Sequence, residues 1–339
     1  MNKNSVFCIA EMSANHNRSL ERAKDIVRAA ARCGADAVKL QTYTADTLTL
    51  DCTDARFMAK GALWAGRNLY DLYKEASMPW EWTSEIMKLA RDLDMDCFST
   101  PCDVTAVDFL EQCGVSRYKI TSFDVVNVPL LKRVAQTGKP VILSTGMANL
   151  GEIDEAVHIL RDNGTQDLTL LKCTSAYPAP PEEVNLRTIP HMATAFGCHV
   201  GLSDHTLGSA VAVAAVAVGA TVLEKHFTLA RADGGPDSAF SMEPDEFRQM
   251  VHDIRVAEKA LGTVSYTLTG EQKRSVQSRP SLCIVKNIAE GQPFTAENVK
   301  CIRPGGGLHS RYFELILGKK ATCNLSAGTP LLFEHVLEG

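Results

Sequence analysis

Several features that would assign a protein class at once are missing from this 339-residue sequence. Its 11 cysteines include no C-x-x-C pair, and an odd, unpatterned count favours reduced thiols in a cytoplasmic protein over a disulfide framework. The longest apolar stretch, Ala210–Leu223, is too short to span a bilayer. The run Val6–Ala10 is too short for a signal peptide, and Glu11 follows it. With a net charge of −5 there is no basic excess, so we expect neither nucleic acid nor a membrane as a partner.

What remains is the composition of an ordinary globular protein, with 45% apolar and 22% charged residues. The length predicts one large domain and one small one. We place the large domain at residues 1–263 and the small one at residues 279–339, where short apolar runs alternate with glycine-rich turns. The polar segment 264–278 lacks apolar periodicity, which predicts a linker that could reach roughly 50 Å if extended.

Short apolar runs alternate with helical patterns along the large domain. The expected strands are residues 6–10, 37–40, 96–98, 117–120, 140–143, 168–171, 199–202 and 221–223. Eight such strands, each followed by a helix, match a (β/α)8 TIM barrel in count, order and length. A doubly wound open sheet is the alternative, but no G-x-G-x-x-G turn follows the first strand.

One long polar insertion interrupts this alternation, from Thr42 to about Trp82. It contains a concentration of large aromatic residues, among them Trp64 and Trp80. Long loops in compact domains are usually functional or disordered, and the aromatic residues argue for order. A lid over a site and packing on the outer rim of the barrel are both open interpretations.

Two histidines, His205 and His226, follow the last two expected strands. The single helix expected between these strands makes them parallel neighbours, so the two histidines would face the same space. Two imidazoles with carboxylates nearby predict a divalent-metal site. The alternative is that one or both histidines are hydrogen-bonded core residues, and the residues alone leave the two interpretations evenly balanced.

The ends of all eight expected strands are polar, and in such a barrel these ends form the active site. The residues there are Glu11, Lys39, Gln41, Ser99, Thr100, Lys119, Ser122, Ser144, Thr145, Lys172, Thr174, Ser175, Ser203, His205, Glu224 and His226. Several lysines with many hydroxyls predict a compact anion such as phosphate or carboxylate. An anion beside a metal that polarises a carbonyl suggests carbon–carbon bond formation with an aldehyde. Asp237, after the last strand, could bind a sugar hydroxyl or a metal-bound water, or could simply form a turn.

Several segments closely resemble the sialic acid synthase family. They are FCIAEMSANHN, AVKLQTY, CFSTP, YKITS, STGMANLGEI, LLKCTSAYPAPPEEVNLRTI, GLSDHTLG and EKHFTLARADGGPDSAFSMEP. The tail SLCIVKNIAEGQPFTAENVKCIRPGGGL resembles the antifreeze-like (SAF) domain of that family. The resemblance covers essentially the whole chain in the same order. SANHN, TSAYPAPPE and GGPDSAFS are most similar to the pseudaminate-forming branch, and N-acetylneuraminate and legionaminate synthases are the alternatives.

The resemblance implies that phosphoenolpyruvate, an acylamino-sugar aldehyde and water give a nine-carbon 2-keto acid and phosphate. For the pseudaminate branch the acceptor would be 2,4-diacetamido-2,4,6-trideoxy-L-altrose. The resemblance also implies that His205 and His226 bind Mn²⁺, or in its place Mg²⁺ or Co²⁺. It further implies a domain-exchanged homodimer, in which we expect Arg303 to contact the N-acyl group of the acceptor in the partner barrel.

On this basis the candidate residues receive roles. We expect Glu11, Lys39, Lys119 and Glu224 to be catalytic, with Glu11 the candidate for proton handling. The residues expected to bind the substrates are Gln41, Thr100, Ser122, Ser144, Thr174, Ser175, Tyr177, Ser203, Asp237 and Arg303. The chain departs from the family pattern at Asp124, where Glu is usual, at Cys102, where an aromatic residue is common, and at residues 278–281.

Two other functions compete with the synthase. Lys172, at the end of the sixth strand, could be the nucleophile of a Schiff-base aldolase on the same barrel. A carbohydrate-binding protein is the non-catalytic alternative, because the tail resembles an ice-binding module. Such a protein has no need of lysines, acids and metal ligands together at the strand ends.

Overall fold

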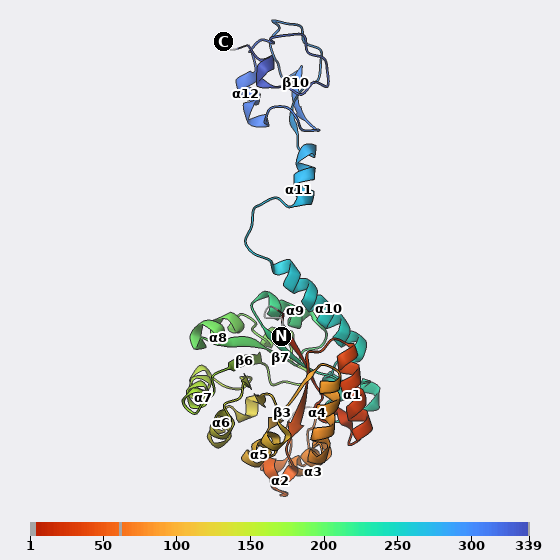
Figure 1. The fold of residues 1–339 in the computed structure, drawn as a ribbon, viewed down its shortest axis with the longest axis vertical. Coiled ribbons are helices and arrows are strands. Elements are labelled where there is room, and N and C mark those ends of the chain that lie inside the picture. Colours follow the sequence, from red (N-terminus) through yellow and green to blue (C-terminus); the bar gives the residue numbers. More distant parts are fainter. Residues whose placement is uncertain (1–4, 61–62, 338–339) are drawn as a thin grey trace. The chain divides into compact units, whose positions relative to one another are not determined.

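The computed structural model describes residues 5–60 and 63–337 of the chain. The chain divides into two compact units, residues 1–262 and residues 263–339, and each is described by itself (Figure 1).

The first unit is a closed barrel of eight parallel strands arranged in sequence order. The strands are β1 (Phe7–Glu11), β2 (Ala37–Thr42), β3 (Asp96–Pro101), β4 (Tyr118–Ile120), β5 (Val141–Ser144), β6 (Leu168–Cys173), β7 (His199–Asp204) and β8 (Val222–His226). The ladder closes where β1 pairs with β8, with Glu11 opposite His226. The prediction of a TIM barrel is confirmed, and the alternative of an open sheet is wrong.

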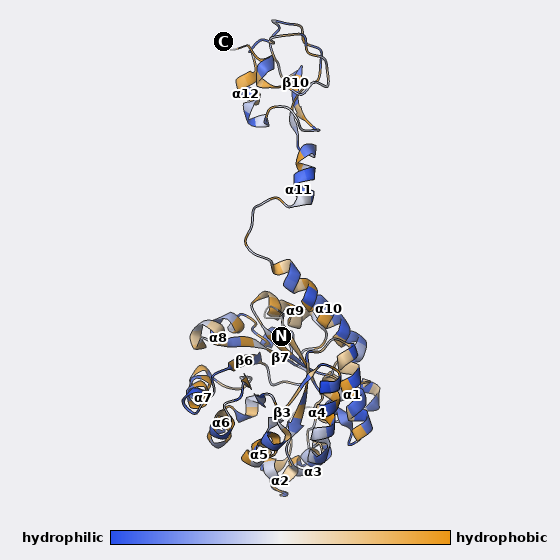
Figure 2. Ribbon diagram, in the orientation of Figure 1, coloured by the Kyte–Doolittle hydropathy of each residue, from blue (hydrophilic) through white to orange (hydrophobic). Residues whose placement is uncertain are grey.

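Helices follow the strands and cover the outside of the barrel (Figure 1). They are α1 (Leu20–Arg32), α4 (Thr83–Asp92), α5 (Val104–Cys113), α6 (Val128–Ala135), α7 (Leu150–Asp162), α8 (Thr188–Phe196), α9 (Ala210–Ala217) and α10 (Pro244–Leu261). The hydroxyl of Ser19 accepts a hydrogen bond from the N–H of Arg22 and so fixes the start of α1. The buried residues of α1 recur at helical spacing and face the strands, a separation of hydrophobic and hydrophilic residues visible in Figure 2. No helix among those described is long and apolar enough to cross a membrane.

Side chains inside the barrel lie in layers, because alternate residues of each strand point inward. The lowest layer is apolar and buried. It consists of Ile9, Ala37, Phe98, Ile142, Leu171 and Val222, with Phe7 packed against them. Two residues further along most of these strands, the inward side chains become polar, as at Glu11, Lys39 and Glu224. The apolar runs in the sequence therefore end before the strands do, and the polar strand ends belong to the barrel wall.

The insertion after β2 is ordered where the structure describes it. It contains the short helices α2 (Ala45–Leu48) and α3 (Leu69–Ala76), which pack against each other. Trp80 stacks on Phe109 of α5, with ring centroids 4.8 Å apart, on the outside of the barrel. The interpretation of outer packing therefore applies to this end of the insertion.

The segment predicted to be a linker is only partly irregular. Residues 262–269 have no helix or strand, but α11 (Gly270–Ser275) and a 3-10 turn follow. Thr269 and Gln272 form a capping box at the start of α11, and Glu271 pairs with Arg274 at 3.0 Å. Such local polar contacts stabilise a short helix without the apolar periodicity on which the linker prediction was based.

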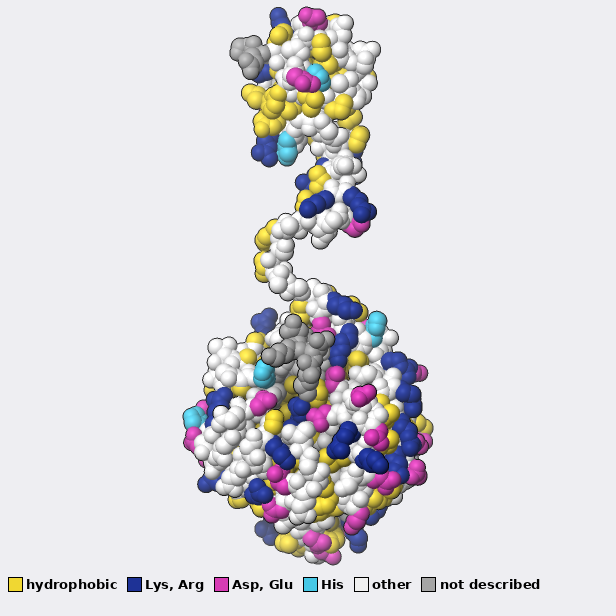
Figure 3. Space-filling view, in the orientation of Figure 1, with side chains coloured by type: hydrophobic (Ala, Val, Ile, Leu, Met, Phe, Trp, Pro, Cys, Tyr) yellow, Lys and Arg dark blue, Asp and Glu magenta, His cyan; other side chains and the backbone are white. Residues whose placement is uncertain are grey.

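The second unit has a small core of its own. Its strands β9 (Ser281–Ile284) and β10 (Val299–Ile302) pair antiparallel, and α12 (Phe313–Ile316) follows. The buried core includes Leu282, Ile284, Phe294 and Val299. Hydrophobic side chains also gather on one side of this unit in Figure 3, whereas both signs of charge are interspersed over the visible face of the barrel.

Candidate active site

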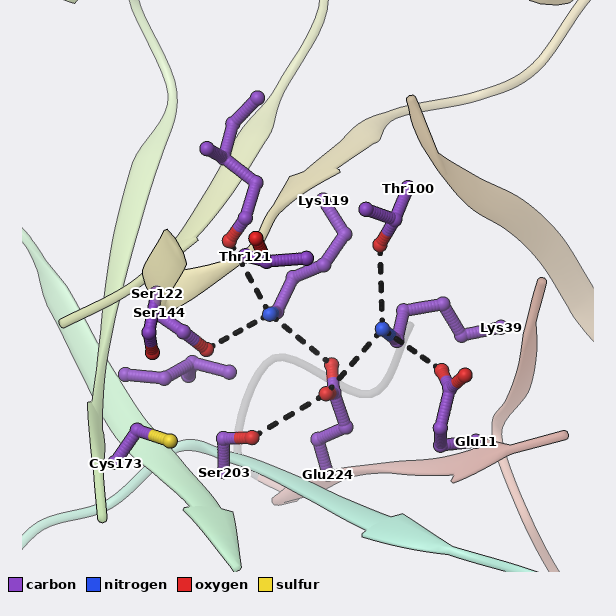
Figure 4. A network of polar contacts seen from close by, with 12 residues as sticks. Glu11, Lys39, Thr100, Lys119, Thr121, Ser122, Ser144, Cys173, Ser203 and Glu224 are labelled. Atoms are coloured by element: carbon purple, nitrogen blue, oxygen red, sulfur yellow. Dashed lines mark hydrogen bonds and ion pairs between the residues drawn. The ribbon is translucent and has the colours of Figure 1, made fainter. Parts of the chain in front are cut away.

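A carboxylate shared by two lysines lies in the polar layer of the barrel (Figure 4). Oε1 of Glu224 is 3.4 Å from the Nζ of Lys39, and Oε2 is 3.7 Å from the Nζ of Lys119. Ser203 donates a further hydrogen bond of 3.3 Å to Oε1. Burial alone would raise the pKa of Glu224, but Lys119 and Lys39 outweigh it and hold the pKa below its usual value. The carboxylate is therefore charged and fixes both ammonium groups.

The second carboxylate, Glu11, has a different environment. It is fully buried, and its Oε2 is 2.8 Å from the Nζ of Lys39. Burial raises the pKa of Glu11 in spite of Lys39, and the nearby Glu224 acts in the same direction. Two carboxylates of different acidity thus lie on either side of one lysine, a pattern typical of proton transfer.

The other lysine, Lys119, faces a group of hydroxyls. Its Nζ donates to Ser144 at 2.7 Å, while Lys39 donates to Thr100 at 3.2 Å. Burial lowers the pKa of Lys119. The fixed hydroxyls and ammonium groups form a set of donors suited to a compact anion.

A glycine that the sequence analysis did not select completes this group. The N–H of Gly146 donates to the hydroxyl of Ser122 at 2.8 Å. A Cβ at this position would lie 2.8 Å from that hydroxyl, 3.1 Å from the thiol of Cys173, and closer still to the hydroxyl of Ser175. Ser122, Ser175 and Cys173 therefore converge on a space that only glycine leaves open.

Two strand-end residues do not join the network. The hydroxyl of Thr174 donates at 3.4 Å to the carbonyl of Glu183 in the following loop, so it turns away from the lysines. Lys172 lies between two inward residues of β6, Leu171 and Cys173, and therefore points outward, where its Nζ donates to a backbone carbonyl at 2.6 Å.

The two histidines face each other at the mouth of the barrel, with ring centroids 5.4 Å apart. Nδ1 of His205 is 2.9 Å from the carbonyl of Thr174, which leaves Nε2 available as a ligand. Nδ1 of His226 is buried and has no hydrogen-bond partner in the part of the chain that the structure describes. Burial holds the pKa of His226 well below its usual value, so this ring is neutral, the form that binds metals.

These observations fit a metal ion with an incomplete protein shell. Within residues 5–60 and 63–337, no group of three or more His, Cys, Asp and Glu side chains could hold an ion. Two imidazoles that face each other, one of them with a buried nitrogen that no described residue contacts, suit an ion that takes its remaining ligands from substrate or water. The donor set present is thus that of an open, catalytic type of site.

Aromatic rings lie beside the histidines. Tyr177 stacks on His205 at 4.3 Å, and Phe240 contacts His226 at 4.8 Å between ring centroids. Trp64, from the insertion after β2, packs against Tyr177 at 5.8 Å and donates through its indole N–H to the carbonyl of Pro236 at 3.0 Å. The aromatic content of the insertion was the only sequence signal for Trp64, and the part of the insertion at Trp64 lies beside the site.

A polar chain connects Glu11 to Asp237. Gln41 donates to Glu11 and to the hydroxyl of Ser13, at 3.0 Å each. Ser13 in turn donates to Asp237. The structure thus brings Asp237 next to the first strand, and Ser13 is a connecting residue that the sequence analysis missed because it lies beyond the end of β1.

Two further residues, Asp124 and Arg303, do not belong to the polar network around the lysines. Asp124 accepts hydrogen bonds from Thr121 at 2.7 Å and from Asn127 at 3.2 Å, so it fixes the turn after β4. Arg303 is an exposed residue of the second unit. The lysines, acids and histidines of the site in the barrel all belong to the first unit.

The comparisons with known proteins agree with this arrangement. Residues 26–266 match the NeuB family, and residues 279–337 match the SAF domain. The chain is 43% identical to "Pseudaminic acid synthase" of Helicobacter pylori, over 97% of each chain. It is 38% identical to "N,N'-diacetyllegionaminic acid synthase" of Legionella pneumophila, over 97% of this chain and 94% of the relative.

One solved structure is a further similar protein. It is an N-acetylneuraminic acid synthetase from Leptospira borgpetersenii in complex with citrate, with a TM-score of 0.71 and 31% identity. The similarity covers 80% of this chain and 90% of that one.

Replacing Gly146 tests the anion-binding group. We expect Gly146→Ala to weaken the binding of phosphoenolpyruvate by about 1–3 kcal/mol, roughly fivefold to a hundredfold in Kd, because the methyl group displaces the hydroxyls of Ser122 and Ser175. Titration calorimetry measures the change. Gly270→Ala is the control, since a Cβ there meets nothing within 4 Å. Unchanged affinity in Gly146→Ala would show that the anion does not use this group.

Proposed function

The chain belongs to the NeuB family, and from this premise we propose that it is a pseudaminic acid synthase. It condenses phosphoenolpyruvate with 2,4-diacetamido-2,4,6-trideoxy-L-altrose and water, and releases pseudaminate and phosphate. The observation that carries the proposal is the polar layer of the barrel, where Lys39 and Lys119 share Glu224 and face fixed hydroxyls. A strongly anionic donor with a phosphate and a carboxylate satisfies these donors.

The residues of the layer divide the work of binding phosphoenolpyruvate. Ser122 and Ser175 lie at the space beside Gly146, and Lys119 donates to Ser144; together these groups suit one anionic group. Lys39 and Thr100, on the other side of Glu224, suit the second. Held at both ends, phosphoenolpyruvate presents its nucleophilic methylene carbon C3 in one fixed orientation, and this removes much of the entropic cost of the reaction.

The bond changes balance with one water. C3 of phosphoenolpyruvate bonds to the aldehyde carbon, water adds its oxygen to C2, and the bond from C2 to the phosphate oxygen breaks. Water loses both protons as its oxygen becomes the C2 carbonyl of the 2-keto acid: the aldehyde oxygen gains one and the departing phosphate takes the other. Glu11, a buried carboxyl with a raised pKa, can hold the transferred proton, and the charged Glu224 keeps the lysines in place.

We assign the divalent ion, most simply Mn²⁺, to His205 and His226. When bound, such an ion supplies Lewis-acid polarisation of a carbonyl oxygen. Nε2 of His205 is available at the mouth of the barrel, and Nδ1 of His226 has no partner among the residues that the structure describes.

The aromatic rings beside the histidines favour a deoxygenated acceptor. Trp64, Tyr177 and Phe240 offer apolar contact, which suits a C6 methyl group better than a hydroxymethyl group. Gln41 and Asp237 offer polar contacts for hydroxyl and acylamino groups. This set supports a trideoxy acceptor over N-acetylmannosamine.

The competing functions fit the geometry less well. A Schiff-base aldolase would use Lys172, whose side chain points out of the barrel. A carbohydrate-binding protein has no use for two buried lysines that share a carboxylate, an arrangement that is costly to bury.

We propose that two copies of the chain form a homodimer in which the SAF unit of one covers the barrel of the other. Both units expose apolar side chains that a partner would cover. In the segments that follow β4, β5 and β7 these are Phe123, Val126, Met147, Leu150 and Leu207, and on the SAF unit they are Ile302, Leu315, Leu332, Phe333 and Leu337. All 11 cysteines are free thiols, which supports a reducing, cytoplasmic location.

The choice of acceptor is the first test of the function. We expect kcat/KM for the altrose derivative to exceed that for N-acetylmannosamine by at least about a hundredfold, because the wrong sugar leaves polar groups unpaired against the aromatic rings. Phosphate release from phosphoenolpyruvate measures the rate with each sugar. Equal or better turnover of N-acetylmannosamine would reassign the enzyme to the neuraminate branch, and preference for the acceptor of diacetyllegionaminate synthesis would reassign it to that branch.

Metal dependence is the second test. Chelator-treated protein is expected to be inactive and to recover with Mn²⁺, and His226→Ala is expected to stay inactive although it is folded. His158→Ala is the matched control, because His158 is an exposed histidine of α7. Full activity after exhaustive chelation would remove the metal from the proposal.

Mixed dimers test the role of Arg303. Arg303→Ala is expected to weaken acceptor binding by about 1.5–3 kcal/mol, roughly tenfold to a hundredfold in KM, through loss of a charged hydrogen bond. A mixture with inactive His226→Ala chains regains one good site per mixed dimer if the SAF units exchange. If subunit exchange is proven and the mixture is no better than the Arg303→Ala homodimer, the exchanged arrangement is wrong.

A further inference from the structure

A buried ion pair lies behind the two histidines, on the outer side of the barrel wall. In β8 the side chains of Glu224 and His226 point inward, so Lys225 between them points outward into the layer between strands and helices. Asp204 of β7 is its neighbour in the ladder, and Nζ of Lys225 is 2.7 Å from Oδ2 of Asp204. The side chains are 1% and 0% exposed, so both charges are removed from water.

The pair closes a ring of hydrogen bonds around His205. Nζ of Lys225 also donates to the carbonyl of Thr206 at 2.7 Å. Oδ1 of Asp204 accepts from the N–H of Thr206 at 2.9 Å and from its hydroxyl at 2.8 Å. The residues on both sides of His205 are therefore tied to the strand that carries His226.

A ring of charged and polar groups is unusual at this position of the barrel wall, and a role in the active site would explain it. Neighbouring outward positions of the wall are apolar and buried, for example Leu202 and Leu223. A buried ion pair is often no more stabilising than apolar side chains of similar volume. Burial lowers the pKa of Lys225, in keeping with the cost of placing an ammonium group there. Stability alone therefore does not account for two charges at this point of the wall.

We propose that Lys225 and Asp204 are positioning residues that hold His205 at the correct distance and orientation from His226 to share one divalent ion. The inference rests on the proposed function, which places the ion at these histidines. Neither residue touches the ion or the substrates. Their effect passes through the backbone of residues 204–206 to the imidazole of His205.

The test is the affinity of the metal-free protein for Mn²⁺, measured by electron paramagnetic resonance of the free ion. Lys225→Met keeps the length of the side chain but removes the bonds to Asp204 and Thr206. We expect its Kd for Mn²⁺ to rise by about tenfold to a hundredfold, the usual effect of removing a group that orients a metal ligand. Arg117→Met is the matched control, because Arg117 pairs with Asp96 at 2.9 Å at the opposite end of the barrel. The control is expected to lower the melting temperature and leave the Kd unchanged.

A second variant covers the case in which Lys225→Met does not fold. Thr206→Val removes one hydroxyl from the ring but leaves the ion pair intact, and it is expected to raise the Kd several-fold. An unchanged Kd in a folded variant, with or without a lower melting temperature, overturns the positioning role and leaves the metal site standing. If the wild-type protein itself binds no Mn²⁺, the metal assignment fails, and the inference fails with it.

Discussion

The chemistry of this barrel depends on charged side chains that are buried and paired with one another, so that they are still able to bind a substrate. One carboxylate, Glu224, is placed between two ammonium groups, so neither Lys39 nor Lys119 is left alone in a medium that penalises isolated ions. Glu11 pairs with Lys39 on the other side, and burial raises the pKa of this carboxyl. The two ammonium groups also contact the hydroxyls of Ser144 and Thr100, which are donors suited to the anionic substrate that we propose.

The closed sheet is what makes this arrangement possible. Each strand presents alternate side chains to the interior, so a single change from apolar to polar residues along every strand creates a layer of donors above an apolar floor. The backbone ladder fixes the positions of these side chains more firmly than loops would. The aromatic rings beside the histidines lie outside the strands instead: Trp64, Tyr177 and Phe240 come from three separate segments.

Much of this could be predicted from the sequence, for identifiable reasons. The eight apolar runs fix the strands, and in a barrel the ends of strands converge, so Lys39, Lys119, Glu224 and the two histidines were recognisable. Side-chain direction was harder to predict, because Thr174 follows the last residue of β6 and its hydroxyl turns to a carbonyl of its own loop. Gly146 gave no signal of its own, since its importance lies in the atoms that surround it. Lys225 was hidden for a similar reason: only the outward register of β8 shows that it lies behind the site.

The apolar layer at the bottom of the barrel determines where substrates enter and products leave. Phe98 and Ile142 fill the interior beneath the polar layer, and the guanidinium of Arg117 lies over Phe98, 5.7 Å from the ring centroid. The interior of the barrel is therefore closed by side chains at one end and open at the other. The two substrates, the water that is consumed, the departing phosphate and the nine-carbon acid all use the same mouth, past the same aromatic rings. Because all of them share this opening, the products have to leave before the next pair of substrates can enter.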